Sequence, residues 1–156
     1  MIGTSFEILL FRSAFAVMAC DGEIHEDEIS IFRSISNSNP YFADLNFEKE
    51  LDIALNAIKS QGIHYINQIL ESLKSLVLKE KQKLLLIEVI LKIMDADKKV
   101  DENELKFLKT ITNILDISEE ILIMKFPTHI NAFLNMSDFS ANLSFKVIEN
   151  NIDNPN

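Results

Sequence analysis

Two short acidic segments of the chain carry the same residue types at the same spacing. Residues 19–28 read ACDGEIHEDE and residues 95–104 read DADKKVDENE. In each segment an Asp precedes a Glu by seven residues, which gives the pairs Asp21 with Glu28 and Asp97 with Glu104. Carboxylate oxygens are the ligands that hard cations such as Ca²⁺, Mg²⁺ and Mn²⁺ prefer. Four carboxylates brought together would therefore form a site for a divalent cation.

The two Asp residues occupy positions at which a carboxylate does not stabilise a helix. Each continues an apolar stripe at helical spacing, so each is expected to point toward neighbouring elements and not freely into solvent. A carboxylate at the carboxyl end of a helix also faces the negative end of the helix dipole, at a cost of about 0.3–1 kcal/mol. A local rule broken twice at equivalent positions suggests function. The two stripes are Leu10, Ala14, Val17 and Asp21, and Leu86, Ile90, Ile93 and Asp97.

Helix capping explains the two Glu residues without any ligand. Asp101 and Glu104 have the spacing of a capping box, in which the Glu at the third helical position reaches back to the cap residue. His25 and Glu28 occupy the corresponding positions in the first segment. Capping leaves Asp21 and Asp97 unexplained, so a shared cation site and a solvated turn both remain open.

An independent EF-hand is excluded in both segments. If Glu28 were position 12 of such a loop, positions 1 and 3 would be Val17 and Ala19. In the second segment position 1 would be Ile93, although Asp95 occupies position 3. An EF-hand loop needs oxygen ligands at positions 1, 3 and 5. What remains is one site shared by two hairpins, each of which supplies one Asp and one Glu.

The elements that must position these residues are predicted to be helices. The chain has 156 residues, of which 47% are hydrophobic, with only three Gly and three Pro, and no sustained alternation typical of strands. We predict an all-α bundle of about seven to eight helices with an internal duplication of an acidic helix hairpin, 4–36 matched by 80–115. The expected helices are 4–20, 25–36, 47–60, 63–78, 79–95, 102–115 and 118–126, with a further helix around 128–136.

The net charge, the cysteine content and the absence of known motifs argue against several classes of function. A net charge of −9 argues against nucleic acid, which requires a basic surface. The single cysteine, Cys20, rules out a disulfide within the chain, which favours a cytoplasmic location. Arg12 interrupts the apolar N-terminal run, so neither an exported lipoprotein nor a membrane span is expected. No recognised catalytic motif occurs, and His25 is expected to be exposed and not a ligand.

At this point the sequence resembles the TerB-like domain of tellurite-resistance and stress-response proteins. The resemblance rests on the acidic phrase, its repetition, and the two helices between the copies. It implies an all-helical cytoplasmic domain at residues 1–126. Residues 127–156 fall outside the resemblance, and from their composition we expect an extension that is partly helical with a frayed end. The resemblance also implies that Asp21, Glu28, Asp97 and Glu104 bind a divalent metal.

The second copy departs from the family pattern, because Lys98 stands where Gly is usual and Lys99 adds a positive charge. The resemblance further implies a non-enzymatic module that has protein partners and an indirect association with membranes in metal-stress assemblies. Two alternatives remain open: a metal-dependent hydrolase that uses the acidic cluster, and a purely structural interaction domain in which the acidic residues only cap helices.

Overall fold

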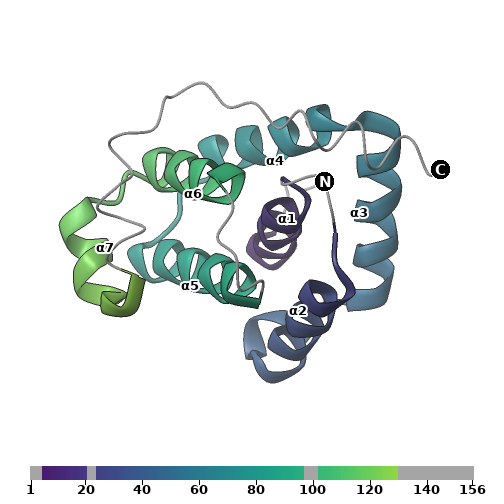
Figure 1. Ribbon diagram of the computed structural model, residues 1–156, viewed down its shortest axis with the longest axis horizontal. Helices are drawn as coiled ribbons and strands as arrows, with labels where there is room; N and C mark the ends of the chain where they lie inside the picture. The colour runs from purple at the N-terminus through teal and green to yellow at the C-terminus, as the bar shows by residue number, and fades with distance from the viewer. Residues whose placement is uncertain (1–4, 21–23, 97–101, 130–156) are drawn as a thin grey trace.

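The computed structural model describes residues 5–20, 24–96 and 102–129, and in this part of the chain it contains helices and no strand (Figure 1). The all-α prediction is confirmed. The elements are α1 (Phe6–Ala19), α2 (Glu26–Ser38), the 3₁₀ helix η1 (Pro40–Phe42), α3 (Phe47–Gln61), α4 (Ile63–Ser75), α5 (Glu80–Ala96), α6 (Glu102–Leu115), α7 (Glu119–Lys125) and the 3₁₀ helix η2 (Pro127–His129).

Side-chain caps explain where several of these helices begin. The side-chain oxygens of Ser5, Asn46 and Ser118 accept backbone N–H donors three residues ahead, at 3.3, 3.1 and 3.2 Å respectively. Each bond satisfies a backbone donor that has no partner inside the helix. Gly62 separates α3 from α4 with a φ of 57°, a conformation that a residue with a Cβ adopts at a cost.

Two predicted boundaries need correction. The helix expected to run to Leu78 ends at Ser75, because Leu76 adopts an extended conformation that breaks the helix. The second helix ends at Ser38, two residues beyond the expected position. The predicted start at Thr4 lies outside the described residues. The helix expected around 128–136 is represented only by η2, since residues 130–136 also lie outside the described part.

Helix α1 forms the centre of the bundle. From Leu9 to Cys20 all of its residues except Arg12 are buried. A helix that is apolar around its whole circumference must be surrounded by other elements. Figure 1 shows this arrangement, with α1 in the middle, and α1 contacts α3, α4, α5 and α6. The N-terminal hydrophobic run is therefore a core helix, and within the described residues no helix has the length and apolar character needed to cross a membrane.

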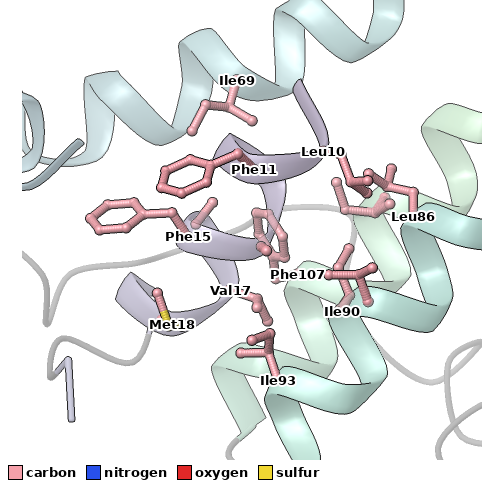
Figure 2. Packing of buried hydrophobic residues seen from close by; sticks show 14 of the residues in the cluster. Leu10, Phe11, Phe15, Val17, Met18, Ile69, Leu86, Ile90, Ile93 and Phe107 are labelled. Carbon is pink, nitrogen blue, oxygen red and sulfur yellow. The ribbon is translucent and has the colours of Figure 1, made fainter. Parts of the chain in front are cut away.

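Helices α1 and α5 pack against each other through equivalent residues of the two repeats. Figure 2 shows Leu10 pointing toward Leu86 and Val17 toward Ile93, and the members of each pair are 76 residues apart in sequence. Since the pairs follow in the same order along both helices, α1 and α5 run parallel. In addition, α2 packs on α5 and α6 packs on α1. The packing of the two hairpins is thus reciprocal, because the second helix of each hairpin packs on the first helix of the other.

A cluster of aromatic rings holds the first hairpin against α3. The Phe32 ring lies 4.7 Å from Phe11, 5.0 Å from Phe47 and 6.3 Å from Phe42, measured between ring centroids. Its contacts with Phe47 and Phe42 are edge-to-face, which is a favourable geometry for aromatic pairs. Phe32 therefore joins α1, α2, η1 and α3 at a single buried point.

Replacing Phe32→Ala should lower the free energy of unfolding by about 3–5 kcal/mol, because it removes a fully buried ring and leaves a cavity. The matched control is Val77→Ala in the connection between α4 and α5, where the side chain is 97% exposed. That control should change stability by less than about 0.5 kcal/mol. Urea denaturation of both variants checks the prediction, and equal losses would contradict the central position of Phe32.

Near this cluster an exposed ion pair joins α2 to α3. Arg33 donates from Nε and from Nη2 to the two carboxylate oxygens of Glu48, at 2.8 and 3.2 Å, and its guanidinium lies 5.4 Å from the centroid of Phe47. These hydrogen bonds hold the pKa of Glu48 below its usual value.

Because the pKa of Glu48 is lower in the folded state, its contribution to stability should exist above the pKa of an unfolded Glu. It should disappear as the pH falls through the folded value. Glu48→Gln should accordingly make stability less dependent on pH in the acidic range. Urea denaturation series between neutral and acidic pH, with Glu71→Gln as an exposed control on α4, test this; parallel pH profiles for wild type and Glu48→Gln would refute it.

Candidate metal centre

Parallel packing of α1 and α5 brings the carboxyl ends of both helices to one end of the bundle. That end lies beside the contact between Val17 and Ile93 (Figure 2). Residues 20–28 follow α1 directly and residues 97–104 follow α5 directly. Glu28 and Glu104, which lie in the first turns of α2 and α6, therefore belong to the same end of the molecule.

Both Glu side chains are buried at equivalent positions. Glu28 is the third residue of α2 and is 1% exposed, and Glu104 is the third residue of α6 and is 0% exposed. The Oε2 atom of each is shielded from solvent. By contrast, the neighbouring first-turn acids Glu26 and Glu102 are exposed. The burial thus singles out the two Glu residues of the repeated phrase from the acidic residues around them.

This burial goes beyond what a helix cap requires. The Oε1 atom of Glu28 accepts the backbone N–H of His25 at 3.2 Å, which is the Glu half of the predicted capping box. His25 itself is exposed, as predicted. A Glu at a helix amino end benefits from the dipole even when it points into solvent. Full burial of a carboxylate is rare unless other groups compensate its charge.

The two Asp residues of the predicted site, Asp21 and Asp97, lie outside the described residues. The structure therefore places Glu28 and Glu104 and says nothing about the positions of their expected co-ligands. Among the described residues no group of three His, Cys, Asp or Glu side chains is arranged to hold a metal ion. The convergence of all four carboxylates remains a prediction.

The chemistry of the predicted donor set fits a hard divalent cation. All four groups are carboxylates, and oxygen ligands of this kind suit Ca²⁺, Mg²⁺ or Mn²⁺. The thiol of Cys20 is buried and donates to the carbonyl of Val17 at 3.1 Å. If a cation binds here, Glu28 and Glu104 would hold it from the first turns of α2 and α6.

Sequence reasoning missed one polar contact near this end of the bundle. His129 Nε2 lies 3.1 and 3.0 Å from the Oδ1 and Oδ2 atoms of Asp95, in the last turn of α5. The two residues are 34 positions apart and belong to no common motif. Only the position of Asp95, which is unfavourable with respect to the helix dipole, hinted that it has a partner.

The fold is that of an all-helical domain in which two helix hairpins pack reciprocally through α1 and α5. The model of the family described as "Tellurite resistance protein TerB" matches residues 8–124, and the chain belongs to this family. Among curated proteins and solved structures, none matches the chain.

Replacing Glu28→Gln should destabilise the metal-depleted protein by a few tenths of a kcal/mol up to about 1 kcal/mol. The amide retains an acceptor for His25, but the uncharged side chain no longer interacts favourably with the helix dipole. Glu104→Gln should behave alike, because it occupies the equivalent position of α6. Urea denaturation in a chelator provides the measurement. A gain in stability would show that repulsion between buried charges outweighs capping.

Proposed function

We propose that the chain is a non-enzymatic TerB-family module that binds one divalent cation between its two acidic hairpins. Asp21, Glu28, Asp97 and Glu104 are the proposed ligands, and Ca²⁺, Mg²⁺ and Mn²⁺ are the candidate ions. The observation that carries the proposal is the burial of Glu28 and Glu104 at equivalent helix starts, at the same end of the bundle. A cation at this end of the bundle would interact favourably with both buried carboxylates.

Family membership supports the wider part of the proposal. On this basis the module works in the cytoplasm in the response to tellurite or another metal stress. It does so by binding protein partners, some of them in assemblies linked to membranes. Cation binding between the hairpins would tie α1 and α2 to α5 and α6, and so would stabilise the surface that a partner recognises.

A cation that binds only the folded state should raise the melting temperature. At a hundredfold excess over Kd the gain in stability is about 2.7 kcal/mol, which corresponds to roughly 5–10 °C for a domain of this size. The measurement is a thermal melt of the chelator-treated protein with Ca²⁺, Mg²⁺ and Mn²⁺ at millimolar concentrations. If none of the three moves the melting curve of the wild type, the capping-only interpretation is correct.

The double variant Asp21→Asn with Asp97→Asn should lose most of the response to metal. It should be at least as stable as the wild type without metal, because it removes two charges that oppose helix dipoles. The matched control is Glu26→Gln with Glu102→Gln, which removes two exposed acids from the first turns of α2 and α6. A control that loses as much of the response would indicate nonspecific attraction to the acidic surface.

The proposed lack of catalysis can be tested with the same proteins. Incubation with a phosphate monoester and with DNA in the presence of Mn²⁺ should give no hydrolysis above that of the Asp21→Asn, Asp97→Asn variant. Turnover by the wild type that this variant lacks would establish the metal-dependent hydrolase instead.

A further inference from the structure

A cavity of about 250 Å³ lies between one face of α5 and the turn that joins α7 to η2. Four residues of α5 line one side, and their spacing of three and four places them along a single face of the helix. Residues 125–129 line the opposite side. The four residues of α5 are Glu88, Leu91, Lys92 and Asp95.

Hydrogen bonds hold the two sides of the cavity in place. His129 Nε2 lies 3.1 and 3.0 Å from the two carboxylate oxygens of Asp95 and so links the turn to α5. The same ring lies 3.1 Å from the hydroxyl of Thr128 through Nδ1. The backbone N–H of Phe126 donates to the carbonyl of Leu122 at 2.9 Å, and that of His129 donates to the carbonyl of Phe126 at 3.0 Å. A ligand that enters the cavity therefore does not have to order its walls, which favours binding.

The lining of the cavity is mainly apolar. Leu91 is 2% exposed and forms the base, and Phe126 packs against the hydrophobic core. Pro127 adds an apolar ring from the turn. A dry cavity of about 150 Å³ in another protein holds one benzene ring. The present cavity thus has room for a ring or a short aliphatic chain together with one small polar group.

Most of the charged side chains at the cavity are paired with each other. Glu88 accepts Lys92 at 3.2 Å, and Asp95 is in contact with His129. Lys125 is different, because no carboxylate of residues 5–20, 24–96 or 102–129 forms an ion pair with its ammonium group. It is exposed and lies in the last turn of α7. The cavity therefore offers one positive charge beside an apolar base.

We propose that this cavity binds a small monocarboxylate that carries an apolar group. The carboxylate would pair with the ammonium of Lys125, and the apolar group would cover Leu91 and Phe126. Sites of this type, mainly apolar with a few placed polar groups, are the usual form of a small-molecule pocket. The inference is independent of the proposed cation site, since neither Glu28 nor Glu104 is among the described residues that line the cavity.

Inorganic phosphate fits the same cavity less well than a monocarboxylate does. A dianion at Lys125 would also face the carboxylates of Glu88 and Asp95, which line the same space. Phosphate has no apolar part, so it would leave Leu91 and Phe126 uncovered. The cavity should therefore discriminate by the charge of the ligand and by its apolar group together.

The test is a titration of the isotope-labelled full-length chain with benzoate in the presence of a chelator, followed by the backbone amide signals. Benzoate should shift the signals of residues 88–95 and 125–129 most strongly, with saturation at concentrations on the order of a millimolar, as suits a ligand of this size. Benzamide keeps the ring without the charge, and acetate keeps the charge without the ring. Each of them should bind at least about fivefold more weakly than benzoate.

Lys125→Gln should weaken the binding of benzoate about fivefold, because it removes the positive charge and keeps most of the side chain. It should also abolish the preference for benzoate over benzamide. The matched control is Lys59→Gln, since Lys59 is likewise exposed and lies in the last turn of α3. That control should leave the affinity within about twofold of the wild type. Thermal melts should show both variants folded, as expected for exposed substitutions.

Equal affinity for benzoate and benzamide, or an equal loss in Lys125→Gln and Lys59→Gln, would overturn the inference. Shifts spread over the whole surface instead of the cavity would overturn it as well. Phosphate that binds more tightly than benzoate would show an inorganic anion site and would equally contradict the proposal. Because the titration is done without metal, none of these results bears on the proposed cation site.

Discussion

The parallel contact between α1 and α5 determines where every other feature of the molecule lies. Leu10 meets Leu86 and Val17 meets Ile93, so equivalent residues of the two repeats face each other across the core (Figure 2). An antiparallel arrangement of the same two helices would send their carboxyl ends to opposite poles. The two acidic segments could then not contribute ligands to one site. Because α1 and α5 are parallel, buried carboxylates from both halves of the chain lie at the same end of the bundle.

Glu28 and Glu104 stabilise the starts of two helices and are also proposed to bind a cation, and the two roles are compatible. A carboxylate in the first turn stabilises the start of α2 or α6 whether or not an ion is present. Burial removes its solvation, which raises the cost of its charge and also its attraction for a cation. A domain built in this way can fold without metal, and the proposed binding of a cation would add stability, since Glu28 and Glu104 are already held by the helices whose first turns they occupy.

Local signals in the sequence predicted most of the fold. Asn46 directly precedes the predicted helix 47–60 and Ser118 opens the predicted helix 118–126, while Gly62 and Pro127 lie at the breaks that follow these helices. The end of α4 was misplaced because residues 76–79 contain neither Gly nor Pro to mark it, and the helix ends where Leu76 becomes extended. The site was predicted from the Asp residues, whereas the burial of Glu28 and Glu104 depends on neighbouring helices. The sequence does not identify His129 as the partner of Asp95, because the contact joins segments from different parts of the fold.

The burial of Cys20 makes the end of α1 accessible to chemical measurement. It is the single cysteine of the chain, its thiol is fully enclosed, and it directly precedes Asp21. A thiol reagent can reach it only when this end of the helix opens, so its rate of modification reports the free energy of that local opening. The natural sequence thus already provides a probe of the stability of this end of the bundle, and no residue has to be introduced for the measurement.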